Sequence, residues 1–406
     1  MPESSDLLRA AIADEIGRRG PIPFARFMEL CLYHPVHGYY TRGIGGGGGR
    51  DYLTSSGIHH AFGVLVARQV EEMWRRAGRP DLFRFVEFGP GEGRFAQDFL
   101  EEASRSRSFA RALQYHLVEP SPVLTTRQKS RLTGRTPIAL WWQSEAGLEE
   151  SAGGDGCLFA NEVLDAFPVH RVVGTVVGPA EIHVAVDAEA PSGFGEIPLP
   201  PSTPAIGRFL EQAGVILEEG QEVDLNLAAP CWVTWASGLL SRGYLMIVDY
   251  GYEGRELYTP QRRRGTLLAY HHHRFNEDFL MRPGDQDLTA HVDFTAVRRA
   301  AEAAGARCLG LVSQARLLLA LGAIGLIKNE LEEMTVDARI EALRDREAIK
   351  ELILPGRMGD RFRVMLLSVG DVPRDLTGLS EPWKQGAVST LSGLPRGGGG
   401  RAEGGR

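Results

Sequence analysis

The sequence predicts an α/β protein built around a parallel sheet. Short apolar strands alternate with helical patterns over residues 81–170, and each of these strands runs into a polar turn. A region of helical periodicity precedes this core, and a stretch of short strands and prolines interrupts it. We therefore expect a core in two halves, with an N-terminal helical cap and an inserted α+β lobe.

Residues 1–80 are predicted to form the helical cap. Apolar residues recur at helical spacing in three runs, and prolines or glycines end each run. The glycine-rich segment GIGGGGG (43–49) is expected to be a flexible loop. The helices are expected near residues 7–16, 24–32 and 58–73.

The remaining elements follow in chain order. Residues 171–240 are predicted to form the inserted lobe, with short antiparallel strands and a helix at 206–218. Residues 241–370 are predicted to be the second half of the core, and residues 371–406 a disordered glycine-rich tail. Within the second half we expect a strand at 243–251, a long polar loop at 252–295, a helix at 296–305, and closing strands at 308–312 and 362–369.

Composition excludes several classes of protein. A net charge of −7 without a basic face argues against nucleic acid as the main partner. Four scattered cysteines without a CxxC pair indicate reduced thiols, and no apolar run is long enough for a membrane span. Because transit peptides avoid acids, the acidic N-terminal segment leads us to expect a cytoplasmic protein.

The segment Phe85–Phe95 contains a glycine turn after an apolar strand. Glycines at 89, 91 and 93 allow the backbone to approach a ligand closely, since they carry no Cβ. The spacing departs from the dinucleotide pattern G-x-G-x-x-G, because the sixth position is Arg94. The turn alone therefore indicates a nucleotide-like ligand without identifying it.

Carboxylates end successive predicted strands, at Glu87, Glu119 and Glu162, and they predict an acidic crevice at one edge of the sheet. S-adenosylmethionine fits such a crevice, since it carries a sulfonium, an ammonium and a ribose diol but no phosphate. Glu119 is expected to accept the ribose hydroxyls, and the glycine turn to hold the methionine part. The expected cofactor-binding residues are Glu87, Gly89, Gly91, Gly93, Glu119, Asn161 and Glu162.

Seven collinear blocks resemble the MidA-like family of class I S-adenosylmethionine-dependent methyltransferases. They are FMELCLYHPVHGYY (27–40), RDYLTSS with AFG (50–63), EFGPGEG (87–93), YHLVEPS (115–121), ANEVLDAFPVHR (160–171), YLMIVDYGY (244–252) and QDLTAHVDF (286–294). The family includes the mitochondrial complex I assembly-factor arginine methyltransferase. The resemblance implies a Rossmann-like class I methyltransferase sheet and a protein arginine as acceptor. Ser56-Gly57 replaces the family's usual Pro-Glu, which puts one ligand contact in doubt.

Four residues are candidates for the chemistry of the acceptor. Glu162 and Asp165 follow a strand end and could orient a guanidinium; alternatively, Asp165 caps a following helix and Glu162 only holds the cofactor. His291 and Asp293 stand one residue apart, and in an extended segment they would share a face as a proton-accepting pair. Asp249 and Tyr250 either face the same crevice or have a structural role.

Other readings of the sequence remain open. The adjacent histidines 271–273 diverge, so no metal site is expected. Tyr39, Tyr40, Asp51, Thr54 and Ser55 flank the glycine loop and could form a lid over the cofactor or an ordinary helix–loop junction. A NAD-dependent oxidoreductase is disfavoured by the turn, and a non-catalytic assembly or chaperone-like factor by the intact acids. We expect a protein substrate, and a homodimer is left open.

Overall fold

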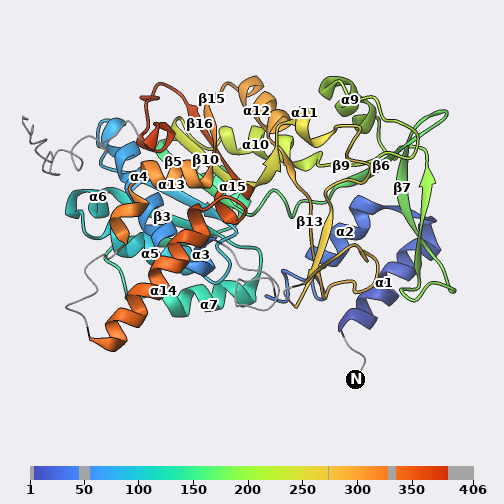
Figure 1. The fold of residues 1–406 in the computed structure, drawn as a ribbon, viewed down its shortest axis with the longest axis horizontal. Coiled ribbons are helices and arrows are strands. Elements are labelled where there is room, and N and C mark those ends of the chain that lie inside the picture. The colour runs from blue at the N-terminus through green and yellow to red at the C-terminus, as the bar shows by residue number, and fades with distance from the viewer. Residues whose placement is uncertain (1–3, 45–54, 273, 328–334, 383–406) are drawn as a thin grey trace, which may run out of the picture.

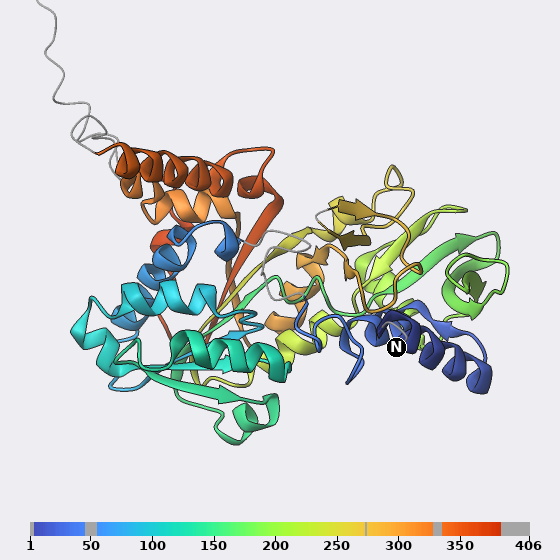
Figure 2. The same ribbon diagram turned by 90° about the horizontal axis from the view of Figure 1, so that it is seen from below.

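The computed structural model describes residues 4–44, 55–272, 274–327 and 335–382. Figures 1 and 2 show two neighbouring parts, an α/β core and a smaller lobe, with α10, α11, α12 and β13 between them. Among the described residues, no helix is both long and apolar enough to cross a membrane.

The core contains a mixed sheet, which confirms the predicted fold class. Its strand order is β15-β16-β10-β5-β2-β3-β4, and β14 adds a short parallel pairing at the end of β10. Five neighbouring strands are parallel, whereas β16 runs antiparallel between β10 and β15. The strands are β2 (Phe83–Phe88), β3 (Leu113–Val118), β4 (Ala139–Gln143), β5 (Asp155–Asn161), β10 (Arg242–Tyr252), β14 (Val292–Asp293), β15 (Arg307–Ser313) and β16 (Phe362–Val369).

The strand order reverses next to β2. The chain moves outward from β2 to β3 and β4, and then returns to the other side of β2 at β5. The loops that leave β2 and β5 therefore diverge, which opens a crevice at the carboxyl ends of the strands.

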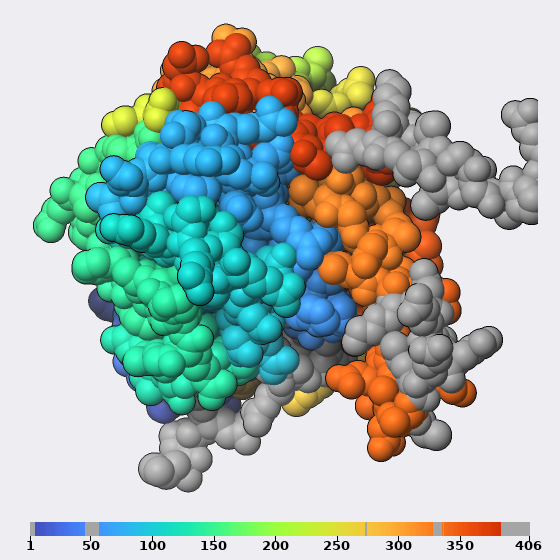
Figure 3. Space-filling model, turned by 90° about the vertical axis from the view of Figure 1, so that its left-hand side faces the viewer, coloured from blue at the N-terminus to red at the C-terminus, as the bar shows by residue number. Residues whose placement is uncertain are grey.

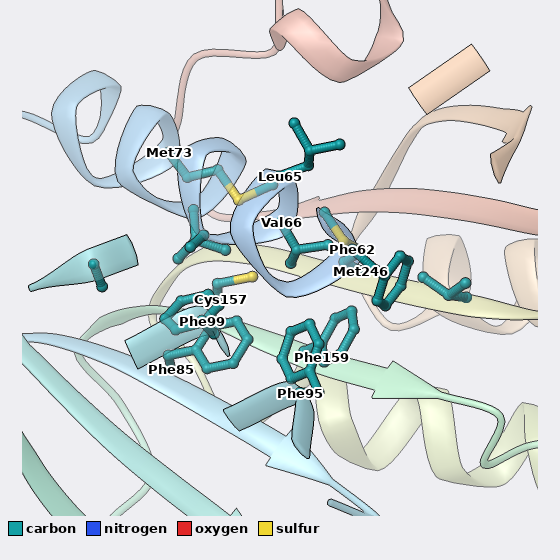
Figure 4. Close-up of a cluster of buried hydrophobic side chains, with 14 of the residues drawn as sticks. Phe62, Leu65, Val66, Met73, Phe85, Phe95, Phe99, Cys157, Phe159 and Met246 are labelled. Atoms are coloured by element: carbon teal, nitrogen blue, oxygen red, sulfur yellow. The ribbon is translucent and has the colours of Figure 1, made fainter. Parts of the chain in front are cut away.

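Helices cover both faces of the sheet, and each face has its own hydrophobic core. On one face Phe85 lies 4.4 Å from Phe99, and Phe95 lies 4.5 Å from Phe159, between ring centroids (Figure 4). Figure 3 shows the outer side of this layer, where α13 and α14 (orange) lie beside the helices of residues 55–150. The core helices are α3 (Ser55–Ile58), α4 (Ala61–Arg76), α5 (Arg94–Ala103), α6 (Arg107–Ala112), α7 (Pro122–Leu132), α8 (Glu145–Glu150), α10 (Ala228–Ser237), α12 (Phe294–Ala303), α13 (Gln314–Ala320), η1 (Ala323–Leu326), α14 (Val336–Ile353) and α15 (Met358–Arg361).

The lobe is a five-stranded antiparallel sheet with the two N-terminal helices packed on it. Leu8 of α1 and Phe27 of α2 share a core with Val184 of β7, whereas α4 packs on the main sheet. The predicted cap helices thus pack in two separate places. The lobe contains α1 (Ser4–Arg19), β1 (Ile22–Pro23), α2 (Phe24–Tyr33), β6 (His170–Thr175), β7 (Gly178–Val186), β8 (Phe194–Leu199), α9 (Pro204–Ala213) and β9 (Glu222–Leu225).

Several predicted boundaries were wrong. The helix expected at 206–218 ends at Ala213, because Gly214 adopts a left-handed conformation with φ 67°. The predicted loop 252–295 instead contains α11 (Gly254–Leu257) and a three-stranded sheet of β12 (Arg274–Asn276), β11 (Leu268–His271) and β13 (Asp287–Thr289). Strands of three or four residues are too short to show a period in the sequence. Helix α14 also escaped the sequence analysis.

The start of the predicted disordered tail is ordered. Val372 and Leu376 are buried, and the short η2 helix (Thr377–Leu379) follows them. The Gly378 amide donates to the side-chain oxygen of the buried Gln69 at 2.8 Å. Residues 383–406, and residues 45–54 of the expected glycine loop, lie outside the described residues.

Replacing Phe99 by alanine is expected to destabilise the core. Phe99 is fully buried among aromatic rings, and a cavity of that size lowers the free energy of unfolding by about 3–5 kcal/mol. Denaturant titration followed by tryptophan fluorescence measures the loss. Val177→Ala is the control, since Val177 is 94% exposed, and it should change the value by about 0.5 kcal/mol or less. Equal effects of the two substitutions would contradict this account of the core.

Candidate functional site

The glycine turn joins β2 to α5 and adopts a conformation that favours glycine at three positions. The φ angles of Gly89, Gly91 and Gly93 are 62°, 54° and 74°. Gly89 is tied to the end of β3, because its amide donates to the Val118 carbonyl at 3.0 Å. A Cβ on Gly93 would lie 3.3 Å from Gln128 Cγ, so this glycine allows α7 to pack closely. Gly89 and Gly91 line the crevice, whereas Gly93 supports the turn from behind.

A cavity of about 390 Å³ occupies the crevice, and we call it the cofactor cavity. It lies at the carboxyl ends of β2, β3 and β5, where the sequence placed the acids. Its lining residues include Tyr33, Tyr40, Glu87, Phe88, Gly89, Gly91, Glu92, Arg94, Glu119, Leu124, Glu145, Asn161, Glu162, Ala166, Phe167 and Trp232.

One buried and one partly buried carboxyl group face this cavity. Glu87 is 3% exposed and accepts a 2.7 Å hydrogen bond from the Tyr115 hydroxyl, and burial raises its pKa to about 8. Glu119 accepts from the Ser121 amide at 2.9 Å, and burial raises its pKa to about 7. Because both pKa values are raised, a cationic ligand would stabilise the ionised forms that burial disfavours.

Glu92 adds little net negative charge to the cofactor cavity, although it lies in the glycine turn. Its carboxylate lies within 4 Å of the guanidinium groups of Arg94, Arg127 and Arg131. These three cations balance its charge, so the acidic character of the cavity comes from the strand ends.

Asn161 and Glu162 lie at the end of β5, across the cavity from the glycine turn. Glu162 has φ 54°, which is unusual for a residue other than glycine and costs about 1–3 kcal/mol. Its amide donates to the Val248 carbonyl at 2.9 Å, and its carboxylate accepts from the Asn161 side chain at 3.0 Å. Such strain at a ligand cavity is typical of functional sites.

Asp249 holds the segment that follows Glu162. Its buried carboxylate accepts from the amides of Leu164 at 3.0 Å, Asp165 at 3.3 Å and Tyr250 at 2.8 Å. Of the two roles left open for Asp249, the structure shows the structural one. No helix follows β5, so Asp165 caps none; the chain turns directly into β6.

Asp165 and Tyr250 line a second cavity of about 230 Å³, which we call the tyrosine slot. Asp165 is 4% exposed, and burial and the neighbouring Asp249 raise its pKa. Burial, and then the charge of Glu162, raise the pKa of Tyr250, so Glu162 lies close to the slot as well as in the cofactor cavity. The slot is lined by Asp165, Tyr250, Tyr252, Leu268, Tyr270, Thr289, Ala290, His291 and Arg361.

His291 and Asp293 do not form the expected pair. His291 lines the slot, and burial lowers its pKa to about 4. Asp293 is instead the N-cap of α12, accepting from the amides of Thr295 at 2.8 Å and Ala296 at 3.1 Å. The helix starts directly after Asp293, and the amides of its first turn have no partner within the helix, so they donate to this carboxylate. Asp293 is not among the residues that line the slot.

Two wall residues of the cofactor cavity, and one buried residue behind the glycine turn, were missed or only partly anticipated. The Tyr33 hydroxyl donates to the Ala166 carbonyl at 3.0 Å, and the Tyr40 hydroxyl to Asp287 at 2.7 Å. Tyr40 was expected near the cofactor, whereas its neighbour Tyr39 is fully buried in the lobe core. Sequence gave no signal for Gln128, which lies on α7.

The remaining residues of the expected lid cannot be placed over the cavity. Asp51 and Thr54 lie outside the described residues. Ser55 begins α3, and Gly57, the position where the family's glutamate is missing, lies in the same short helix. The lid therefore stays a prediction.

Gln128 supports two residues of the cofactor cavity, Gly91 and Glu119, and Gln128→Leu should weaken cofactor binding. Its amide donates to the Gly91 carbonyl at 2.7 Å and to Glu119 at 3.3 Å, and accepts from Trp142 at 3.1 Å. Losing these bonds should raise the Kd of S-adenosylmethionine about 10–100-fold in calorimetric titration. Thr126→Ala on the exposed side of α7 should leave it unchanged. A Kd within twofold of wild type for both variants would refute the role of Gln128.

The raised pKa values of Glu87 and Glu119 predict pH-dependent binding of S-adenosylmethionine. Both groups gain ionised fraction as the pH rises from 6 to 7.5, so affinity for the cationic ligand should increase over this range. The affinity should increase by at most about tenfold per pH unit for each proton that is released on binding. Titration at several pH values measures it, and Glu119→Gln should flatten the curve. Affinity that falls over this range would contradict the assignment.

Comparison with known proteins agrees with this geometry. Residues 65–312 match the family model described as "Putative S-adenosyl-L-methionine-dependent methyltransferase". The mitochondrial protein arginine methyltransferase NDUFAF7 of Danio rerio is 28% identical, covering 87% of this chain and 84% of that protein. Its Drosophila melanogaster homolog is 30% identical, and the match covers 86% of this chain and 82% of that protein. A crystal structure from Burkholderia thailandensis with bound S-adenosyl-homocysteine is 30% identical, with a TM-score of 0.80 over 94% of this chain and 97% of that one. This chain therefore belongs to the family of S-adenosylmethionine-dependent methyltransferases, and S-adenosylmethionine is its cofactor.

Proposed function

We propose that this methyltransferase acts on an arginine side chain of a protein. The observation that carries the proposal is the position of Glu162 between two cavities. Glu162 lines the cofactor cavity, and its charge acts on Tyr250 and Tyr270 of the tyrosine slot. The printed names of the relatives, protein arginine methyltransferases, support arginine as the acceptor.

The residues of the cofactor cavity fit S-adenosylmethionine. The carboxylates of Glu87 and Glu119 suit a ligand with two cationic groups and a diol, and the cavity volume of about 390 Å³ accommodates a nucleoside with an amino-acid tail. Glu119 would accept the ribose hydroxyls, while the backbone at Gly89 and Gly91 would lie along the methionine part. When bound, the cofactor supplies an electrophilic methyl group on a sulfonium.

The tyrosine slot is the proposed acceptor site. Asp165 would accept hydrogen bonds from the guanidinium, and the tyrosine rings offer faces to a planar cation. Glu162 would orient the nitrogen that faces the cofactor cavity and draw positive charge away from it. Most of the rate would come from this alignment, which is worth roughly 7–11 kcal/mol in intramolecular models.

Glu162→Gln should abolish most methyl transfer. The assay incubates the protein with tritium-labelled S-adenosylmethionine and the proteins of a deletion strain, and then analyses the hydrolysed amino acids. Wild type should label arginine, and the variant should be slower by about 10²–10³-fold because a preorganised charge is lost. Glu211→Gln, on the exposed side of lobe helix α9, should match wild type.

The outcomes of this assay separate the candidate functions. Label in another amino acid would overturn arginine as the acceptor, and label in no protein would overturn a protein substrate. Full rescue of a deletion strain by Glu162→Gln would point to a non-catalytic assembly factor.

A further inference from the structure

A third, polar cavity lies on the other side of the tyrosine slot. It has a volume of about 530 Å³ and is bordered by the lobe sheet and by residues 262–281. Its charged lining includes Arg171, Glu196, Glu222, Asp224, Glu277 and Asp278. Within the described part of the chain, only His291 and Leu268 line both this cavity and the slot, so the two spaces meet at these side chains.

The imidazole of His291 is held firmly at this boundary. Its ring is stacked on Tyr250, with centroids 6.3 Å apart and planes 13° apart, and it contacts Tyr252 at 5.4 Å. The His291 amide donates to the Thr266 hydroxyl at 3.0 Å, which fixes the backbone. These contacts orient the ring without using its nitrogens.

One nitrogen of this ring has an unmet hydrogen-bonding capacity. Nδ1 of His291 is buried and has no hydrogen-bond partner among the described residues. A buried polar atom without a hydrogen-bond partner destabilises the fold, so its presence indicates a functional role. Burial, and then Arg262, keep the imidazole neutral at pH 7 and free to accept a proton. The charged and titratable groups around it are Tyr250, Tyr252, Tyr270, Asp165, Arg262 and Arg361.

Methylation of a guanidinium releases one proton. The acceptor nitrogen forms a bond to the methyl carbon while the carbon–sulfur bond breaks. The electron pair of the broken bond stays on sulfur, so the sulfonium becomes a neutral thioether. The acceptor then carries a second positive charge, and it returns to a single charge by losing an N–H proton. Since that N–H is strongly acidic, a weakly basic imidazole is sufficient to take the proton.

We propose that His291 accepts this proton in the tyrosine slot and releases it into the polar cavity. The proposal rests on the arginine acceptor proposed above. Asp165 stays in the slot as the partner of the cation, whereas His291 faces both spaces and can pass the proton outward. A carrier that binds the proton only weakly returns to its neutral form before the next turnover.

His291→Asn tests the proposal, because asparagine keeps a polar side chain but cannot carry the proton. With the proteins of a deletion strain as acceptor, methyl transfer at pH 7 should fall about 100-fold, while the Kd of S-adenosylmethionine stays the same. The remaining rate should rise with pH, since water and hydroxide must then remove the proton. His183→Asn is the control, as His183 is a buried histidine of the lobe that lines neither space.

Chemical rescue distinguishes proton transfer from a structural role. Added imidazole should restore part of the activity of His291→Gly, and it should do nothing for Glu162→Gln. A rate for His291→Asn within twofold of wild type over pH 6–9 would overturn the proposal, as would the absence of rescue.

A second measurement is independent of turnover and of the identity of the acceptor. In the full-length protein with S-adenosyl-homocysteine, the ring signal of His291 in a histidine-labelled NMR spectrum should titrate well below pH 6. Agmatine, a small guanidinium compound, should shift that signal in wild type and not in Asp165→Asn. An ordinary titration, or no response to agmatine, would overturn the proposal even if no labelled protein were found.

Discussion

The buried carboxylate of Asp249 fixes the geometry on which both cavities depend. It lies at the end of β10 and accepts hydrogen bonds from the amides of Leu164 and Asp165, which leave the end of β5. This contact forces the chain to turn directly after Glu162, with φ 54° at that residue. Glu162 is thereby directed to the cofactor cavity and Asp165 to the slot. Without these amide bonds the buried carboxylate would be unsatisfied and the turn unsupported.

Acids whose pKa is raised by burial are the common electrostatic feature of the site. Glu87 and Glu119 in one cavity and Asp165 in the other all have raised pKa values, with burial as the first cause. Arg94, Arg127 and Arg131 already balance Glu92, so the negative charge offered to a ligand comes from the acids at the strand ends. The fold thus stores a preference for cationic ligands, which matches the sulfonium of the cofactor and the proposed guanidinium of the acceptor.

One wall of the cofactor cavity is assembled from segments far apart in the sequence. Tyr40, from the N-terminal segment, bonds to Asp287 of β13, and Tyr33 bonds to the carbonyl of Ala166. The N-terminal helices pack on the sheet of the inserted lobe, and Tyr33 and Tyr40 of this N-terminal segment line the cofactor cavity. The lobe therefore supports the cofactor cavity indirectly, through the N-terminal segment that packs on it.

The sequence by itself determined the sheet, the glycine turn and the acids at the strand ends, because strand periodicity and positive-φ glycines are local properties. Glu87, Glu119 and Glu162 could be placed at one edge, since parallel strands share their carboxyl ends. Only the tertiary structure decided that Asp293 caps α12 while His291 faces the slot, and that Gln128 supports the turn. Those roles depend on where a helix begins and which distant residue packs against it. The short strands of residues 268–289 also depend on the tertiary structure, because pairing with one another stabilises them. They are too short to show a strand period in the sequence.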